Sequence, residues 1–461
     1  MDNINLPEAF VQRLRASYPD ADEMIAAIAT PPFLSVRLNP RKPFDSSVLP
    51  LADNVAWNDT DGRYLSARPN FTLMPHFHAG AFYVQEASSM FLSHVLASIM
   101  NNLPSTPVCL DLCAAPGGKS TLLLSRLSTS GVVVANEVVR SRAWILRENV
   151  AKWGHPGAIV TNRTPAEIAS SGARFDVVAV DAPCSGEGMF RKDDVAVTEW
   201  SPKAAADCAV RQRSILSDIW PALRTGGYLI YSTCTFNPAE NEDNMQWAVE
   251  QLGAEVVNVD IPEGWGITRR IFNAGQGYAF LPHKVRGEGF FMCLLRKVDA
   301  TTSSVSSGKR RRAPAADVKP SNLGADFVDD SMRCFALADD VFAFPADRAR
   351  LMQELTVLLS PIMSGISVGV QVKKKNTVSL NPAPELALSS SLMPGRFGAV
   401  DVDSHVALKF LHGDTDLPLT DLSDAWTLIS HAGLHLGFVK PVGNRLNNYY
   451  PKEWRIRMSV Q

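Results

Sequence analysis

The sequence is poor in long apolar runs. None approaches the roughly 18 residues that a membrane-spanning helix requires, and we expect no membrane anchor. The first residues, Met1 to Ile4, carry no basic region followed by an apolar core, so we expect no secretory signal either. Composition is otherwise ordinary for a globular protein, with 46% hydrophobic and 20% charged residues.

Cysteine is scarce and irregularly spaced. The seven cysteines are an odd number, several lie in apolar strand-like runs, and no Cys-x-x-Cys pair occurs. This pattern argues against a disulfide framework and against a zinc site, and it indicates reduced thiols in the cytoplasm. A formal net charge of −2 and a pI near 6.5 exclude a wholly basic nucleic-acid-binding protein, although a local basic patch remains compatible.

Two cysteines stand out because each follows a predicted buried strand. Cys184 comes shortly after the apolar run at residues 175–180, and Cys234 shortly after the run at residues 227–231. In an open α/β sheet the chemistry sits at the carboxyl ends of the strands. If the two strands are neighbours, about 5 Å apart, both thiols face one crevice.

A third motif predicts a nucleotide-binding turn. Residues 113–119 follow a predicted strand at 108–112 and open a helix, yet they match neither a dinucleotide fingerprint nor a P-loop. Glycines 117 and 118 allow a ligand to approach the backbone, and Glu137 ends the next strand, where an acid can bind ribose hydroxyls. A ligand with a ribose and no pyrophosphate, such as an adenosyl cofactor, fits this turn.

Paired thiols suit the activation of a pyrimidine. A thiolate that adds to carbon 6 of the ring makes carbon 5 nucleophilic toward a methyl group, and a second thiol can assist the final elimination. The alternative is that both cysteines only pack in the core, but each lies among small polar residues just past a strand. We interpret Cys109, Cys208, Cys293 and Cys334 as structural, and Cys113 as either structural or part of the cofactor turn.

These motifs carry a resemblance. Residues 111–119, 181–188 and 232–242, with the segments 83–90, 189–192 and 442–451, resemble the RNA cytosine-5 methyltransferases of the Nop/Sun type, and among them the bacterial enzymes of 16S rRNA. The resemblance covers nearly the whole chain. It implies a Rossmann-like, doubly wound α/β core, S-adenosyl-L-methionine as methyl donor and a C-terminal PUA-like RNA-binding domain.

The resemblance also implies a role for each site residue. It implies that Cys234 is the nucleophile, that Cys184 aids product release, and that Asp181 and, more remotely, Lys119 contact the target base. The residues expected at the cofactor are Cys113, Ala114, Ala115, Pro116, Gly117, Gly118, Lys119, Glu137, Asn162 and Asp181. Asn162 is a departure, because related enzymes often have an aspartate near the adenine amino group at this point.

We therefore expect a cytoplasmic, monomeric enzyme that methylates carbon 5 of a cytosine in 16S rRNA, without a metal. Basic residues on a predicted helix at 141–153 and the cations and aromatic residues at 436–457 are expected to contact RNA. Three alternatives stay open. They are the same chemistry on tRNA or 23S rRNA, a non-catalytic RNA-binding assembly factor with the same fold, and a small-molecule methyltransferase, which the C-terminal part disfavours.

The domain organisation follows from changes in composition. We expect an N-terminal accessory domain at 1–75, a methyltransferase core at 76–300, and a Ser-rich linker at 301–325 with a basic cluster at Lys309 to Arg312. An intermediate α+β domain at 326–395 and the PUA-like domain at 396–461 complete the chain.

Overall fold

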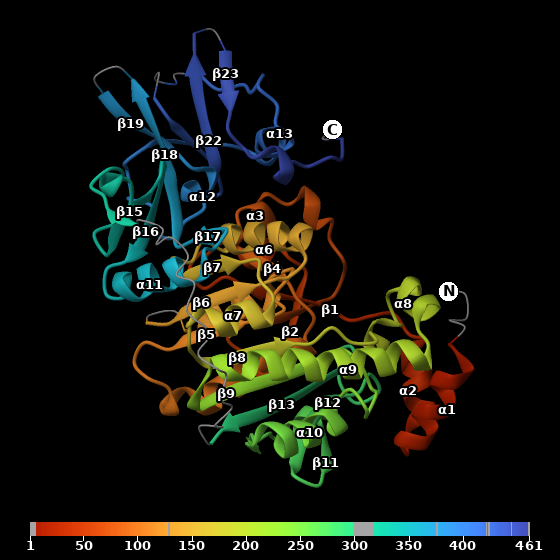
Figure 1. The fold of residues 1–461 in the computed structure, drawn as a ribbon. Helices are drawn as coiled ribbons and strands as arrows, with labels where there is room; N and C mark the ends of the chain where they lie inside the picture. Colours follow the sequence, from red (N-terminus) through yellow and green to blue (C-terminus); the bar gives the residue numbers. More distant parts are fainter. Residues whose placement is uncertain are drawn as a thin grey trace.

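The structure is a computed structural model that describes residues 6–127, 130–298, 318–374, 377–420, 422, 425–443 and 445–459. Its strands form four sheets (Figure 1). The C-terminal sheets lie above the central sheet in that view, and the first two helices lie at its lower right. The predicted basic cluster at 309–312 lies outside the described residues.

The N-terminal region combines a helical hairpin with a small antiparallel sheet. Two short helices lie between residues 8 and 28, and a strand follows at residues 34–38. Two further strands at 51–54 and 62–65 were missed, because this Pro- and Asp-rich stretch has no clear alternation. The sheet has the order β2-β3-β1-β4, so it includes a strand beyond the expected boundary at residue 75. The elements are α1 (Glu8–Ser17), α2 (Ala21–Ile28), β1 (Leu34–Leu38), β2 (Leu51–Asn54), β3 (Gly62–Leu65) and β4 (Phe82–Val84).

The Rossmann-like core is confirmed. Five parallel strands take the order β9-β8-β5-β6-β7, and the order reverses between β5 and β8, which is where ligands bind in such sheets. The strands are β5 (Val108–Asp111), β6 (Val132–Asn136), β7 (Ala158–Thr161), β8 (Phe175–Asp181) and β9 (Leu223–Thr233). The helices of this region are α3 (Pro75–His78), α4 (Leu92–Ile99), α5 (Gly118–Arg126), α6 (Arg140–Trp153), α7 (Pro165–Ser171), α8 (Asp194–Glu199), α9 (Pro202–Ile219) and α10 (Glu242–Leu252).

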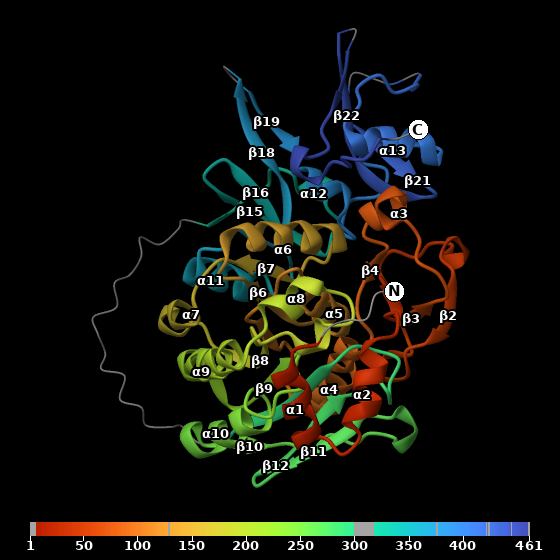
Figure 2. The same ribbon diagram turned by 90° about the vertical axis from the view of Figure 1, so that its right-hand side faces the viewer.

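Both faces of this sheet are buried, which explains why its strands are continuous apolar runs. Alternate residues enter different cores: Cys109 and Val133 pack on one side, and Leu110 and Val134 on the other. Helices α4 and α5 lie against the first core, and α7, α9 and α10 against the second (Figure 2).

The central sheet of the doubly wound core is not purely parallel. Strand β13 extends it by pairing antiparallel with β9, and β13 in turn pairs with β10 and β12. At the opposite edge, β17 from the C-terminal half pairs antiparallel with β7. These strands are β10 (Ala254–Val256), β11 (Thr268–Phe272), β12 (Gly275–Phe280), β13 (Phe290–Lys297) and β17 (Met363–Ser364).

The C-terminal half forms two α+β units, as predicted in outline. A five-stranded antiparallel sheet comprises β14 (Lys319–Pro320), β15 (Met332–Leu337), β16 (Asp340–Pro345), β18 (Ile366–Lys374) and β19 (Thr377–Pro382), with α11 (Ala349–Leu359) and α12 (Pro384–Ala387). A four-stranded sheet comprises β20 (Gly398–Asp401), β21 (Thr427–His431), β22 (Leu434–Val442) and β23 (Arg445–Asn448), with α13 (Ser404–His412). Phe410, Tyr450 and Trp454 of the last unit are buried in the same core cluster as α4 and α5, so this unit packs firmly on the rest.

Local sequence signals determine where the core helices begin and end. Thr164 and Glu167 form a reciprocal capping box at the start of α7, and the Ser201 hydroxyl caps α9 just before Pro202. Helix α6 ends at Gly154, whose φ of 76° suits glycine because no Cβ is present to clash. Within the described residues, no helix is long and apolar enough to cross a membrane.

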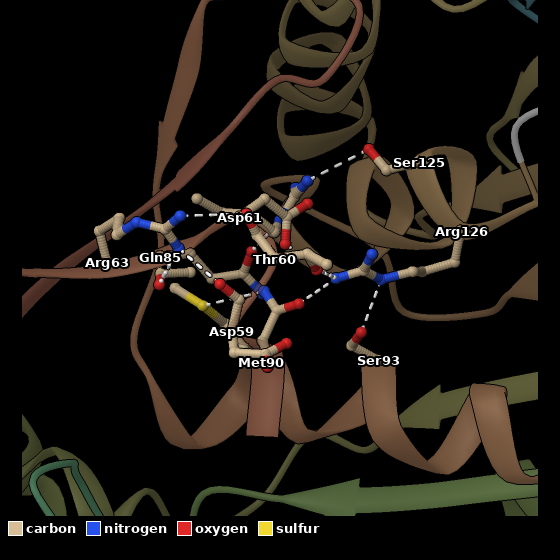
Figure 3. Close-up of polar contacts among 12 residues, drawn as sticks. Asp59, Thr60, Asp61, Arg63, Gln85, Met90, Ser93, Ser125 and Arg126 are labelled. Atoms are coloured by element: carbon tan, nitrogen blue, oxygen red, sulfur yellow. Dashed lines mark hydrogen bonds and ion pairs between the residues drawn. The ribbon is translucent and has the colours of Figure 1, made fainter. Parts of the chain in front are cut away.

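A partly buried arginine links the N-terminal sheet to helix α5. The Arg126 guanidinium forms an ion pair with Asp61 at 2.8 Å and donates to the Thr60 hydroxyl at 2.7 Å, and its Nε donates to Ser93 at 2.6 Å. Figure 3 shows this side chain between Ser93 and the turn at residues 59–61. Because α5 begins at the predicted cofactor turn, this network fixes the turn relative to the N-terminal region.

Replacing Arg126 with methionine is expected to destabilise the protein by about 2 kcal/mol, because the buried Asp61 carboxylate loses its partner. A lower apparent melting temperature would show this effect. Arg350→Gln is the matched control: its ion pair with Glu354 is exposed, so its removal should change stability by less than about 0.5 kcal/mol. Equal melting temperatures for Arg126→Met and the wild type would contradict the assigned role.

Candidate active site

The two predicted thiols lie side by side. Parallel strands β8 and β9 pair in a register that sets Asp181 against Ser232, so the loops that follow begin together. The sulfur atoms of Cys184 and Cys234 are 3.2 Å apart, and the backbone N–H of Cys234 donates to the Cys184 sulfur at 3.3 Å. Both cysteines are free and partly buried, which confirms the prediction that their side chains meet.

The environment of the pair distinguishes the two sulfur atoms. The hydrogen bond to the Cys234 sulfur and burial together raise the pKa of the Cys184 thiol well above its ordinary value. Cys184 is therefore a neutral S–H group at neutral pH and can donate to its neighbour. Of the two residues, only Cys234 is among those that line the adjoining cavity.

A buried carboxylate holds the two cysteine loops together. Glu240 accepts hydrogen bonds from the Ser185 backbone N–H at 2.9 Å, from the Ser185 hydroxyl at 2.5 Å and from the Gln212 amide at 2.9 Å. The Ser185 hydroxyl also lies 2.8 Å from that of Thr235. Since Ser185 follows Cys184 and Thr235 follows Cys234, this network fixes the separation of the thiols.

A second buried acid joins the same loops to the N-terminal helices. Glu187 binds Arg13 of α1 at 2.7 Å, the Trp200 indole N–H at 3.0 Å and the Phe236 backbone N–H at 3.1 Å. The Tyr18 hydroxyl donates to the Phe236 carbonyl at 2.9 Å. The predicted N-terminal accessory segment thus supports the thiol loops directly.

A cavity of about 390 Å³ opens beside Cys234 at the carboxyl ends of β5 and β8. From the predicted site, its wall contains Cys113, Ala114, Ala115, Pro116, Gly118, Lys119, Asp181 and Cys234. The cavity lies at the reversal of strand order, and its size is that of a small-molecule site. The structure therefore brings most of the predicted catalytic and cofactor residues to one place.

Two residues of the cavity wall, Lys119 and Asp181, form an ion pair. The Lys119 ammonium lies 2.8 Å from the Asp181 carboxylate and 5.1 Å from the centre of the Phe290 ring. Burial alone would lower the pKa of Lys119, but the Asp181 carboxylate outweighs it and raises this pKa above the ordinary value. Ser232 donates to the other Asp181 oxygen at 2.8 Å. Both side chains are thus held in place beside the thiols.

Gly117 is the residue before α5 and has a φ of 120°, which favours glycine. A Cβ there would lie 3.3 Å from the Leu146 side chain. The Asn149 amide donates to the Pro116 carbonyl at 2.8 Å and holds the turn from α6. The turn is therefore fixed by packing against α6, whereas Gly117 itself does not line the cavity.

Glu137 and Asn162 are placed differently from the other predicted residues, because neither lines this cavity. The buried Glu137 carboxylate accepts from the Val139 N–H at 2.9 Å and pairs with Arg142 at 3.3 Å, and Arg142 also donates to the Ala115 carbonyl. The Asn162 amide donates to the backbone carbonyls of Glu137 and Val138. Asn162 thus holds the loop after β6, with Arg142 linking that loop to the cofactor turn.

Three segments of the cavity wall had no assigned role in the sequence analysis. They contribute Tyr83, Val84, Gln85, Glu86 and Ser89, then Met189 and Lys192, then Glu288, Gly289 and Phe290. The first two belong to stretches that supported the family resemblance, so a signal existed. Residues 288–290 gave no signal in the sequence, because β13 and a hydrogen bond bring them to the cavity. In that bond the Glu288 N–H donates to the Glu86 carboxylate at 2.9 Å.

Comparison with known proteins identifies the family. Three family models match: the N-terminal domain of the 16S rRNA methyltransferase RsmF at residues 6–87, the 16S rRNA methyltransferase RsmB/F at 99–296, and the RsmF PUA domain at 397–456. Ribosomal RNA small subunit methyltransferase F of Klebsiella pneumoniae strain 342 is 29% identical, over 98% of this chain and 97% of its own. The chain belongs to the RsmB/F family.

Other relatives agree with this assignment. Ribosomal RNA small subunit methyltransferase F of Salmonella agona strain SL483 is 28% identical, over 98% of this chain and 96% of its own. Among solved structures, a methyltransferase homologue from Pyrococcus horikoshii is 25% identical with a TM-score of 0.54, and it covers 64% of this chain and 96% of its own. NSun6 from the same organism shares the fold, with 19% identity, a TM-score of 0.55, and coverage of 64% of this chain and 98% of its own.

The RsmB/F family comprises S-adenosylmethionine-dependent methyltransferases of 16S rRNA. The predicted PUA-like domain at the C-terminus is confirmed by its own family model. Among the described residues, no group of three or more histidine, cysteine or acidic side chains could hold a metal ion.

Glu240→Gln should slow methyl transfer by about tenfold to a hundredfold, because an NH₂ group would then face the donors on Ser185 or Gln212 and displace the thiol loops. The KM for the methyl donor should change little, since Glu240 does not line the cavity. Steady-state kinetics on 16S rRNA would measure both parameters. Glu250→Gln, on the exposed face of α10, is the control and should behave as the wild type; a normal rate for Glu240→Gln would contradict the positioning role.

The stability of the protein should depend on the ionisation of Asp111. Burial raises the pKa of this carboxyl to about 7, although the Ser120 hydroxyl and Lys119 favour the charged form. Between about pH 4 and pH 7 the folded state therefore keeps a proton that the unfolded state releases, so stability falls as the pH rises through this window.

Asp111→Asn removes the pH dependence that this carboxyl causes, and the amide oxygen of the asparagine can still accept the hydrogen bond from the Ser120 hydroxyl. Relative to the wild type, the variant should gain about 3 kcal/mol between pH 5 and pH 8. Urea denaturation of both proteins at the two pH values would measure the difference. A pH-independent difference would show that Asp111 titrates normally in the folded protein.

Proposed function

We propose that this member of the RsmB/F family transfers a methyl group from S-adenosyl-L-methionine to carbon 5 of a cytosine in 16S rRNA, through a temporary covalent bond between Cys234 and the base. The observation that carries the proposal is the pair of sulfur atoms 3.2 Å apart at the rim of the cavity. A structural role alone would not require a second thiol to be held against one that lines a cavity.

Cys234 is the nucleophile in this proposal. Its thiolate adds to carbon 6 of the cytosine, and the electrons of the carbon 5–carbon 6 double bond become available at carbon 5. Carbon 5 takes the methyl group while the donor sulfur keeps the electron pair of the broken bond. Carbon 5 then loses its proton to water, and the bond between Cys234 and carbon 6 breaks to restore the double bond. Because Cys184 stays protonated, its S–H group can stabilise the Cys234 thiolate before addition and again as it leaves.

Asp181 and Lys119 are proposed to recognise the base. Addition at carbon 6 places negative charge on the ring, so a proton passed from the Lys119 ammonium through the Asp181 carboxylate to the ring nitrogen would stabilise the adduct. Lys119, which lies 2.8 Å from the Asp181 carboxylate, can also reach the base carbonyl. The target cytosine must leave its stack to enter the cavity.

The cavity is compatible with the methyl donor. The donor supplies an electrophilic methyl group on a positively charged sulfur. The turn at Cys113, Ala114, Ala115, Pro116, Gly117 and Gly118 would hold it, with Lys119 and Asp181 beside it. One Asp111 oxygen beneath this turn is buried without a hydrogen-bond partner, which suits a polar ligand above it. Glu137 is proposed for the ribose hydroxyls, and Asn162, whose amide donates to the carbonyls of Glu137 and Val138, for the adenine side.

Cys184→Ala is expected to accumulate a covalent protein–RNA adduct, because the bond forms but its release loses assistance. Cys234→Ala should give neither adduct nor methylated product. A denaturing gel of each variant with 16S rRNA and the methyl donor would show the adduct, and sequencing after bisulfite treatment would locate the cytosine. Cys208→Ala, on helix α9, is the control and should methylate without adduct.

Normal methylation by both Cys184→Ala and Cys234→Ala would rule out the thiol mechanism. The same gel with tRNA and 23S rRNA separates the proposal from its alternatives, since only the true substrate accumulates adduct. Absence of adduct and of product with every RNA would favour the non-catalytic assembly factor.

A further inference from the structure

A second cavity is lined by residues that are distant from the two thiols in the sequence. It has a volume of about 630 Å³ and opens between the five-stranded and four-stranded C-terminal sheets. Trp426, Lys440 and Tyr449 form one wall, Ser379 and Asn381 of β19 form the other, and Arg396 and Phe397 lie between them. The PUA family model spans 397–456, so one wall of this interdomain cleft comes from residues outside that domain.

Aromatic rings dominate one side of the interdomain cleft. The Trp426 and Tyr449 rings lie 4.3 Å apart between centroids, and both side chains are only partly buried. Behind them, Phe438 packs edge-on against Trp426 and Phe397, and Phe397 packs against Phe327. This packing fixes the exposed rings in place, so the cleft is built before any ligand arrives.

The interdomain cleft also carries positive charge. The Lys440 ammonium lies 5.1 Å from the centre of the Trp426 ring, and no ion pair joins it to a carboxylate among the residues described. Arg396 lies over Phe327 at 4.8 Å and pairs with Asp326 at 2.7 Å, where both side chains are substantially exposed. Asn381 adds an exposed amide that can both donate and accept hydrogen bonds.

We propose that the interdomain cleft binds an unpaired nucleotide of the substrate RNA, with its base stacked on Trp426 and Tyr449 and its phosphate beside Lys440. Stacking surfaces interleaved with cations are how proteins hold single-stranded RNA. A base pair in a helix cannot offer its face to a ring, so the ligand is single-stranded. The inference rests on the proposed function in taking RNA as the substrate, and it adds a second contact point outside the catalytic cavity.

The test uses the full-length protein and a fluorescently labelled ten-nucleotide single-stranded RNA of mixed sequence, with affinity measured by anisotropy. Trp426→Leu should weaken binding about tenfold, because a stacked base loses its platform. Lys440→Gln should weaken binding and lower the slope of log affinity against log salt by about one. A duplex RNA of the same length should bind more weakly and respond to neither substitution.

Two controls match these changes. Trp247→Leu alters a partly buried tryptophan of α10, and Lys203→Gln removes an exposed cation of α9, outside the interdomain cleft. Both should bind the single strand as the wild type does. Wild-type affinity for Trp426→Leu and Lys440→Gln, or an equal loss for their controls, would overturn the proposal; Lys440→Gln decides the matter if Trp426→Leu fails to fold.

The outcome is separable from the catalytic mechanism. In a Cys184→Ala background at saturating 16S rRNA, the cleft variants should still accumulate the covalent adduct, because the thiols are untouched. Loss of single-strand binding with adduct intact supports the interdomain cleft, whereas loss of adduct in Cys184→Ala alone, with binding intact, would refute only the thiol mechanism.

Discussion

The parallel pairing of β8 and β9 is the constraint on which the site depends. Strands in register across Asp181 and Ser232 end at the same level, so the loops that carry Cys184 and Cys234 start side by side. The sequence forces this pairing because both strands are apolar on both faces and are stable only between two helical layers. A shift of one residue would turn every side chain of the strand to the opposite core and separate the thiols.

Two buried carboxylates convert that proximity into a fixed distance. Glu240 and Glu187 each contact both cysteine loops, and each is satisfied by several donors rather than by a single counter-ion. Burying a carboxylate is unfavourable unless it is well hydrogen-bonded, so such groups are retained where geometry matters. The N-terminal helices take part through Arg13 and Tyr18, which explains why this region and the core form one structural unit.

The sequence predicted the parts of the fold that are set locally. The parallel strands, their helices, the adjacency of the thiols and the turn at residues 113–119 all followed from apolar runs bounded by glycine and proline. The antiparallel strands beside β9 and the addition of β17 beside β7 could not be predicted, because those pairings join segments far apart in the chain. The orientation of side chains could not be predicted either. The amide of Asn162 donates to the backbone carbonyl of Glu137, whereas the sequence predicted this residue at the cofactor. Residues 288–290 reach the cavity wall only because distant strands pair. The domain boundaries and the roles of the site residues stay predictions.

The central claim is that the sulfur of Cys234, and not that of Cys184, bonds to carbon 6 of the target base. RNA in which that cytosine carries fluorine at carbon 5 tests it directly in the wild-type protein, because fluorine cannot leave as a proton does and the adduct cannot resolve. After digestion of protein and RNA, mass spectrometry should find the methylated fluorocytidine nucleotide on the peptide that contains Cys234. The same mass on the Cys184 peptide, or a freely released methylated base, would contradict the account.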